Sequence, residues 1–170
     1  MNTILFDGPE WSQLLPLTYT RPIAAVRCGI LTITEKWNTI LKTPISYASR
    51  DYLSNKFESV LANENLFING SILPDTEFTQ KLESLKLDEV LIKEGSVLAF
   101  KCNKQVADEL IQIIKKGKLE IYNFSKIEYS ATLSTITHSW DIFQKTGNEI
   151  KKDIELLGIK AKTKEIKNEN

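Results

Sequence analysis

Short apolar runs alternate along the chain with segments whose apolar residues recur every three or four positions. The first pattern predicts buried strands, and the second predicts helices with one apolar face. Strands and helices that alternate in this way predict an α/β domain with a mixed, mostly parallel sheet and flanking helices. The strands are expected at Ile4–Phe6, Ile45–Ala48, Leu66–Ile68 and Leu119–Asn123, with a hairpin of Glu89–Ile92 and Val97–Lys101 around Glu94-Gly95.

Polar residues that precede the helical segments mark their expected starts, because Ser, Thr, Asp and Asn side chains accept hydrogen bonds from the first free backbone N–H groups. Thr34, Ser49, Asp75 and Asn103 are the expected capping residues, and Gly117 ends one helix. The helices are expected to run to Leu41, Val60, Leu85 and Lys116 from these caps, with a last helix at Trp140–Leu156.

Composition and charge narrow the function classes. The 170 residues are 42% hydrophobic and 26% charged, with 22 basic and 22 acidic residues, so no net charge draws the chain to nucleic acid or to an anionic membrane. No apolar run approaches the roughly 20 residues that span a bilayer, and Met1–Asp7 lacks the features of a signal peptide. We therefore expect a cytoplasmic domain over residues 1–158, a polar tail over 159–170, and reduced, buried thiols at Cys28 and Cys102.

The loop after the first strand carries the candidate chemistry. In open α/β sheets, ligands bind outside the carboxyl ends of the strands, which is where Asp7-Gly8 stands. Backbone N–H groups at Gly8 suit a phosphate, and the guanidinium groups of Arg21 and Arg27 suit its charge.

Structural roles compete with each of these assignments. Asp7 is also a turn former, Arg21 a solvated side chain, Arg27 a member of an ion pair, and Thr18 a hydroxyl that holds the loop. Asn69-Gly70 is a turn in either case. Trp11 either closes over a nucleotide base or fills the space of a lost ligand pocket. Asp141 and Asp153 are interpreted as helix-cap and helix-surface carboxylates.

The order of residues in this loop resembles the signature loop of sugar-1-phosphate nucleotidyltransferases. Pro16-Leu17-Thr18 and the following Pro22 stand as they do in that family. More closely, the chain resembles the N-terminal part of proteins of the bifunctional N-acetylglucosamine-1-phosphate uridylyltransferase/glucosamine-1-phosphate acetyltransferase type. The likeness rests on Phe6-Asp7-Gly8-Pro9, Thr20-Arg21-Pro22 and the segment Ser139–Phe143. The acetyltransferase β-helix is absent from these 170 residues.

The resemblance implies a reduced nucleotide-diphospho-sugar transferase fold of Rossmann-like form, and a role in making cell-envelope precursors. Its reaction joins a nucleoside triphosphate to a sugar-1-phosphate with Mg²⁺. It also implies a homo-oligomer or a partner acyltransferase domain. The implied catalytic residues are Arg21 and Arg27, and the implied substrate-binding residues are Asp7, Gly8, Thr18, Asn69 and Gly70.

Departures from the family pattern fall at both halves of the implied site. Pro9 and Trp11 stand where the family has glycines, and Gln13 stands where it has the loop arginine. Ile23 replaces the lysine that holds the sugar phosphate, and Ser71 replaces the aspartate that binds magnesium. Three hypotheses stay open at this point: an active transferase, a non-catalytic ligand-binding or assembly module on the same fold, and an unrelated α/β binding domain.

Overall fold

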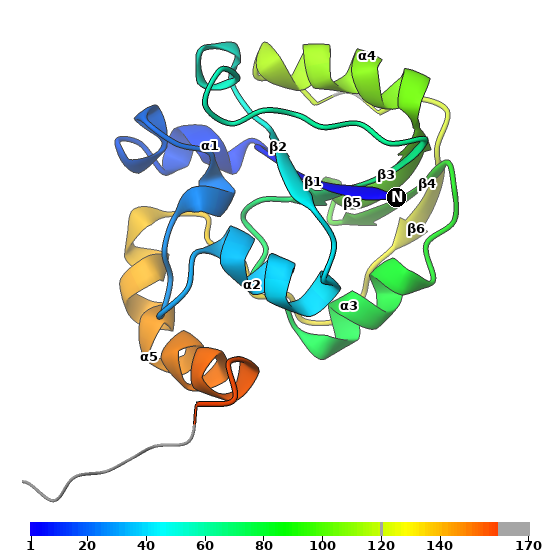
Figure 1. Ribbon diagram of the computed structural model, residues 1–170. Coiled ribbons are helices and arrows are strands. Elements are labelled where there is room, and N and C mark those ends of the chain that lie inside the picture. Colours follow the sequence, from blue (N-terminus) through cyan, green and yellow to red (C-terminus); the bar gives the residue numbers. More distant parts are fainter. Residues whose placement is uncertain (120, 160–170) are drawn as a thin grey trace, which may run out of the picture.

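The computed structural model describes residues 1–119 and 121–159. In that part of the chain, strands form one sheet in the order β2-β1-β3-β5-β4-β6 (Figure 1). β1 pairs in parallel with β2 and β3, β4 pairs in parallel with β6, and β5 runs antiparallel to β3 and β4. The predicted mixed, mostly parallel sheet is confirmed. The strands are β1 (Asn2–Phe6), β2 (Ile45–Ala48), β3 (Glu64–Asn69), β4 (Glu89–Lys93), β5 (Ser96–Asn103) and β6 (Ser125–Glu128).

Helices cover both faces of the sheet, so the domain has three layers (Figure 1). α4 lies on one face, while α2, α3 and α5 lie on the other. The α-helices are α1 (Glu10–Gln13), α2 (Ile33–Leu41), α3 (Thr76–Glu83), α4 (Lys104–Lys115) and α5 (Ser139–Leu156). Short 3-10 turns are η1 (Leu17–Tyr19), η2 (Ile23–Ala25) and η3 (Asp51–Leu53).

Two apolar clusters fill the spaces between the layers. Successive side chains of a strand point to opposite faces of its sheet. Ile4 and Phe6 of β1 therefore belong to the cluster under α4, and Leu5 belongs to the cluster under α2 and α3. Cys28 and Cys102 are buried free thiols, as expected from the sequence.

Several predicted helix boundaries are confirmed by their capping contacts. The Asp75 side chain accepts a hydrogen bond from the Phe78 N–H at 2.8 Å, and Asn103 accepts one from the Val106 N–H at 3.0 Å. Gly117, just past α4, adopts a φ of +78°, which suits glycine at a helix end.

Three expectations are wrong. Thr32 rather than Thr34 caps α2, because the Thr34 hydroxyl donates to the Ala24 carbonyl at 2.9 Å. The helix expected over residues 50–60 is reduced to η3, since the Ser49 hydroxyl that should have capped it donates to Asp7 instead. Residues 119 and 121–123 form no strand, and β6 pairs with β4 a few residues later.

No helix in the described ranges has both the length and the apolar character that crossing a membrane requires. Residue 120, in the strand expected at 119–123, lies outside the described part of the chain, as does the tail from residue 160 onward.

Candidate ligand sites beside the carboxyl edge of the sheet

Three parallel strands end side by side and define the candidate site. Phe6 of β1 pairs with Ala48 of β2 and with Asn69 of β3, so the residues that follow these strands meet at one edge. The loop singled out in the sequence therefore starts where α/β folds bind ligands.

Asp7 is buried at this edge and is held by neutral donors. It is 5% exposed, its Oδ1 accepts a hydrogen bond from the Ile23 N–H at 2.8 Å, and its Oδ2 accepts one from the Ser49 hydroxyl. Burial raises the pKa of Asp7 from 3.8 to about 6, against the smaller lowering effects of the Ser49 and Ile23 hydrogen bonds. Asp7 thus ties β1 to η2 and β2.

Gly8 and Asn69 are covered by a side chain that sequence reasoning missed, that of Glu10. The Asn69 Nδ2 lies 3.3 Å from both Glu10 carboxylate oxygens and 3.4 Å from the Val97 carbonyl. A Cβ added to Gly8 would overlap Glu10 Oε2 and would lie 2.8 Å from Asn69 Nδ2. The Glu10 carboxylate therefore occupies the space above Gly8 where the sequence predicted a phosphate. Glu10 begins α1 within a segment that the sequence indicated only as loop.

Gly70 and Ser71 continue the edge beyond β3. The Gly70 N–H donates to the Phe6 carbonyl at 2.8 Å, and a Cβ on Gly70 would lie 3.2 Å from the Ala24 backbone nitrogen. Gly70 therefore permits close packing of two backbones. Ser71 is fully buried, and its hydroxyl has no hydrogen-bond partner among the described residues.

Trp11 and Thr18 lie in the segment that follows β1 and hold it in place through their contacts. The Thr18 hydroxyl donates to the Trp11 carbonyl at 2.8 Å, so Thr18 holds the loop. The Trp11 ring packs against the apolar core, and the Arg50 guanidinium carbon lies 4.5 Å from the ring centroid, a cation–π contact. Arg50 was not singled out in the sequence, because a β2–η3 loop residue gives no periodic signal.

Arg21 and Arg27 lie together in a different place. Both are exposed and line a cavity of about 580 Å³, whose walls include Leu17 and, from α5, Ser139 and Phe143. The Arg27 guanidinium also lies 3.7 Å from the carboxylate of Glu35. The cavity wall does not include the other predicted site residues, Asp7, Gly8, Thr18, Asn69 and Gly70. The structure thus divides the predicted site into an arginine-lined cavity and a closed strand edge.

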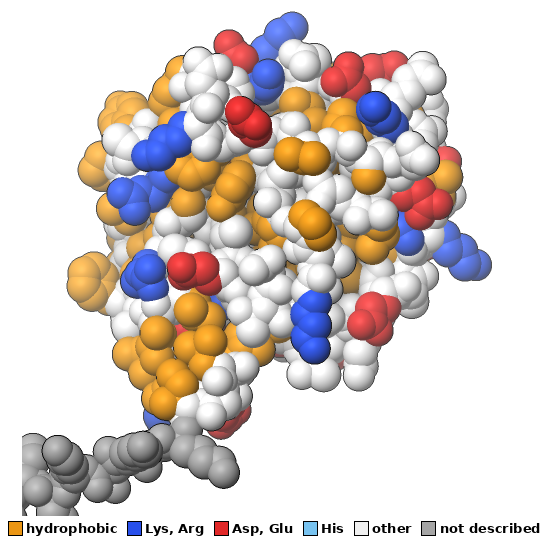
Figure 2. All heavy atoms as spheres, in the orientation of Figure 1, with side chains coloured by type: hydrophobic (Ala, Val, Ile, Leu, Met, Phe, Trp, Pro, Cys, Tyr) orange, Lys and Arg blue, Asp and Glu red, His pale blue; other side chains and the backbone are white. Residues whose placement is uncertain are grey.

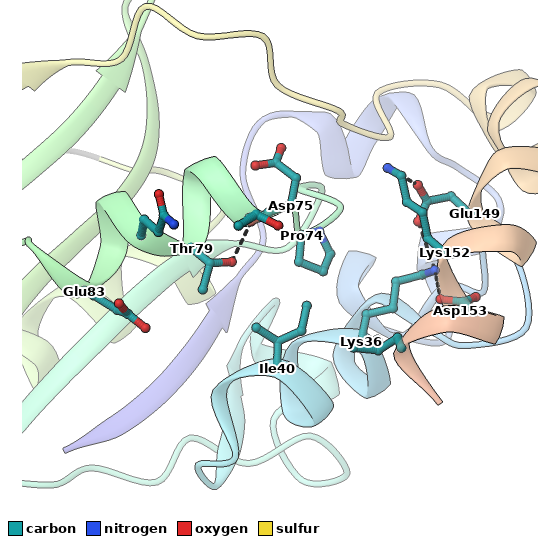
Figure 3. A pocket seen from close by; sticks show the side chains of 12 residues that line it. Lys36, Ile40, Pro74, Asp75, Thr79, Glu83, Glu149, Lys152 and Asp153 are labelled. Carbon is teal, nitrogen blue, oxygen red and sulfur yellow. Dashed lines mark hydrogen bonds and ion pairs between the residues drawn. The ribbon is translucent and has the colours of Figure 1, made fainter. Parts of the chain in front are cut away.

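A second hollow, of about 570 Å³, lies between α2, α3 and α5 (Figure 3). At its wall the ammonium group of Lys36, 2% exposed, contacts the carboxylates of Glu149, at 2.9 Å, and Asp153. Asp153 also accepts hydrogen bonds from the backbone N–H groups of Ile30, at 2.8 Å, and Leu31, at 3.1 Å.

Two predictions about carboxylates of α5 have different outcomes, one at the ion cluster and one at the first turn of the helix. Asp153 is 1% exposed, so the interpretation of it as a helix-surface carboxylate is wrong. Asp141 is a capping carboxylate, as expected, because it accepts from the N–H groups of Thr137 and His138 at 2.8 Å each. Lys152, whose ammonium group lies 2.8 Å from Glu149, supplies a second cation for the two carboxylates, which makes the cluster an anchor for α5 rather than a reactive site.

Within residues 1–119 and 121–159, no three His, Cys, Asp or Glu side chains gather in a way that would hold a metal ion.

No curated protein matches the chain. A family model described as sugar nucleotidyl transferase matches residues 3–162. The chain therefore belongs to the sugar nucleotidyl transferase family.

Proposed function

We propose that this domain binds a phosphorylated sugar or nucleotide on a nucleotidyltransferase fold and does not carry out efficient nucleotidyl transfer. The observation that carries the proposal is the Glu10 carboxylate, which lies over Gly8 and contacts Asn69 at the edge where the reacting phosphates would bind. Phosphoryl-type transfer depends on positive charge around the phosphates, whereas a carboxylate at that position repels them and occupies their space.

The residues at the edge do not fit a Mg²⁺ site. Magnesium is usually held by one or two carboxylates together with substrate phosphates and water. Both oxygens of Asp7 already accept hydrogen bonds from neutral donors, and burial favours the protonated form of this carboxyl. Ser71 offers a buried hydroxyl in place of a carboxylate.

The arginine-lined cavity supports the binding half of the proposal. Its volume of about 580 Å³ falls in the range of small-molecule sites, roughly 300–1,000 Å³. Arg21 and Arg27 supply donors for a phosphate, and Leu17 and Phe143 supply an apolar wall for a sugar or base. The phosphate would compete with Glu35 for Arg27.

An active transferase is the second candidate, and the shared location of Arg21 and Arg27 favours it. Two guanidinium groups at one cavity neutralise part of the charge of a triphosphate in the absence of the missing lysine. In that case the resemblance to uridylyltransferase/acetyltransferase-type proteins makes UTP with an amino-sugar-1-phosphate the first substrates to test.

The two candidates are separated by measuring binding and turnover on the same preparation. Pyrophosphate release from UTP and dTTP is followed with a panel of sugar-1-phosphates, with and without Mg²⁺, and binding of the same compounds is measured by calorimetry. We expect binding that weakens about tenfold or more in Arg21→Ala and Arg27→Ala, with no turnover. Lys116→Ala, an exposed cation at the end of α4, is the matched control.

Two results would contradict the proposal. Magnesium-dependent pyrophosphate release that is lost in Arg21→Ala would establish the transferase instead. Absence of binding for every nucleotide and sugar phosphate would remove the ligand-binding role.

A further inference from the structure

α5 buries two carboxylates on its inner face and exposes most of its apolar residues. Glu149 and Asp153 are buried, while Trp140 and Phe143 are 57% and 85% exposed. Of the apolar residues of α5, Ile142 alone packs against the core of the described residues. In Figure 2 the hydrophobic side chains gather over the lower part of the molecule, where α5 lies in Figure 1. A patch of this kind is typical of a protein–protein contact.

The outward residues follow the spacing of a coiled-coil seam. Successive members of the seam are three, four, three, four and three positions apart, which is the repeat of the a and d positions of a heptad. Along α5 and the residue just after it, the seam consists of Trp140, Phe143, Gly147, Ile150, Ile154 and Leu157. Ile150, Ile154 and Leu157 are 37%, 36% and 41% exposed. A continuous seam of this spacing is complementary to another helix rather than to a small molecule.

We propose that this α5 seam pairs antiparallel with the α5 seam of a second copy of the chain. One two-fold axis, midway between Gly147 and Ile150, brings all the seam positions into register. The opposed pairs across it are Trp140 with Leu157, Phe143 with Ile154, and Gly147 with Ile150.

The sizes of the opposed residues are complementary in this arrangement. A Cβ placed on Gly147 would have no atom within 4 Å, so the helix surface is open there. That opening receives Ile150 of the second copy, and the larger Trp140 and Phe143 meet aliphatic residues. A parallel pair would instead oppose Gly147 with Gly147 and Trp140 with Trp140, leaving a gap in one layer and crowding in another.

The orientation of α5 is fixed by its own domain before such a contact forms. Lys36 fixes the inner face through Glu149 and Asp153, so the seam needs little reordering before it binds. Beside the helix, the exposed Leu17 borders the same cavity as Phe143 and widens the apolar surface. A stable interface buries roughly 800 Å² on each partner, so an apolar surface that extends beyond the helix favours a stable dimer.

The oligomeric state of the full chain tests the proposal directly. Sedimentation equilibrium from about 5 to about 200 µM is expected to give a mass of twice 19.4 kDa. Ile150→Glu and Ile154→Glu should weaken the dimer about tenfold or more. Neither residue lines the arginine cavity. Val60→Glu, at a 56% exposed residue outside α5, is the control and should stay dimeric.

Cysteine pairs test the orientation. The double variant Trp140→Cys/Leu157→Cys should form a covalent dimer on oxidation, and neither single variant should. The two positions lie about 25 Å apart along one helix, so no disulfide forms within a chain. Cys28 and Cys102 are buried and stay unreacted.

Several outcomes would overturn the proposal. A monomer at the highest concentration, a trimer, or a dimer that Ile150→Glu leaves intact would each exclude the pairing of two α5 seams. A covalent dimer of Trp140→Cys alone would exclude the antiparallel arrangement. Circular dichroism of each variant shows that it is folded, which the exposed positions of these residues lead us to expect.

Discussion

The two longest helices of the domain are attached to it in opposite ways. α4 buries Ala107, Leu110 and Ile114 against the sheet and points its charged residues to solvent. α5 buries Glu149 and Asp153 and exposes its apolar residues. The difference shows that the apolar stripe of a helix does not by itself identify the face that packs against its own domain.

Different energetics follow from the two attachments. The α4 interface is non-directional, because removal of apolar area from water stabilises it wherever the packing is good. The α5 interface is directional, because buried ions are tolerated only when their partners are in place. An ion cluster adds little net stability over an apolar contact, yet removal of one partner is costly.

The largest effect is expected at the ion cluster. Lys36→Met leaves Asp153 without a cation and Glu149 with Lys152 alone, and it should lower the free energy of unfolding by about 3 to 5 kcal/mol, measured by urea denaturation. Adding Glu149→Gln and Asp153→Asn should recover part of this loss, because the unpaired charges are then gone. A loss below about 1 kcal/mol for Lys36→Met would show that α5 does not depend on the cluster.

The corresponding change in α4 removes apolar contact. Leu110→Ala should lower the free energy of unfolding by about 3 kcal/mol, because it leaves a cavity between α4 and the sheet. Glu109→Ala, at the next and exposed position, should change it by less than about 0.5 kcal/mol. Equal effects of the two substitutions would contradict the assignment of the buried face.

Asp7 offers a third case, a buried carboxyl whose hydrogen bonds come from neutral donors. Its pKa is about 6 in the folded state, against 3.8 for an ordinary aspartate side chain, so between pH 3.8 and about pH 6 the folded protein binds more protons than the unfolded chain. Asp7 therefore stabilises the fold at low pH, and this contribution is lost as the pH rises. The free energy of unfolding should fall by about 2 kcal/mol between about pH 4.5 and about pH 7.

The Asp7→Asn variant checks this sign. It lacks the titrating group but keeps an acceptor for Ile23, so its stability should fall less than that of the native protein over the same pH interval. Urea denaturation of both proteins at each pH gives the difference, in which all other titrations cancel. Parallel pH profiles would refute the raised pKa.

The same contrast explains what the sequence was able to predict. The spacing of apolar residues identified α4 and α5 alike, because both have a clear helical repeat. It carried no information on which way α5 faces, since Lys36 and Asp153 lie far apart in the sequence and their contact depends on the fold. Polar residues were equally ambiguous in the Ser49 region, where a hydroxyl expected to cap a helix bonds to Asp7.

The candidate site was predicted only in outline. The position of Asp7, Gly8 and Asn69 at the strand edge followed from the alternation of strands and helices. The separate location of Arg21 and Arg27 did not, because it depends on how the loop folds back against α5. Glu10 gave no signal, since a single carboxylate in a loop has no pattern from which its contact with Asn69 could be inferred.

The smallest effect is expected where the two helices are alike, at their first turns. Asn103 accepts a hydrogen bond from the Val106 N–H at the start of α4, and Asp141 accepts two, from Thr137 and His138, at the start of α5. Asn103→Ala should lower the free energy of unfolding by about 1 kcal/mol, and Asp141→Ala by slightly more, because two backbone donors lose their acceptor.

Asp141→Asn separates the hydrogen bonds from the charge. The amide oxygen retains an acceptor for the backbone donors, so most of the stability lost in Asp141→Ala should return, less the few tenths of a kcal/mol that a negative charge contributes near a helix N-terminus. If Asp141→Ala has no effect while Asn103→Ala does, the first turn of α5 is not coupled to the rest of the domain. If Asn103→Ala and Asp141→Ala lower the free energy of unfolding by similar amounts, α4 and α5 differ only in what their long faces contact.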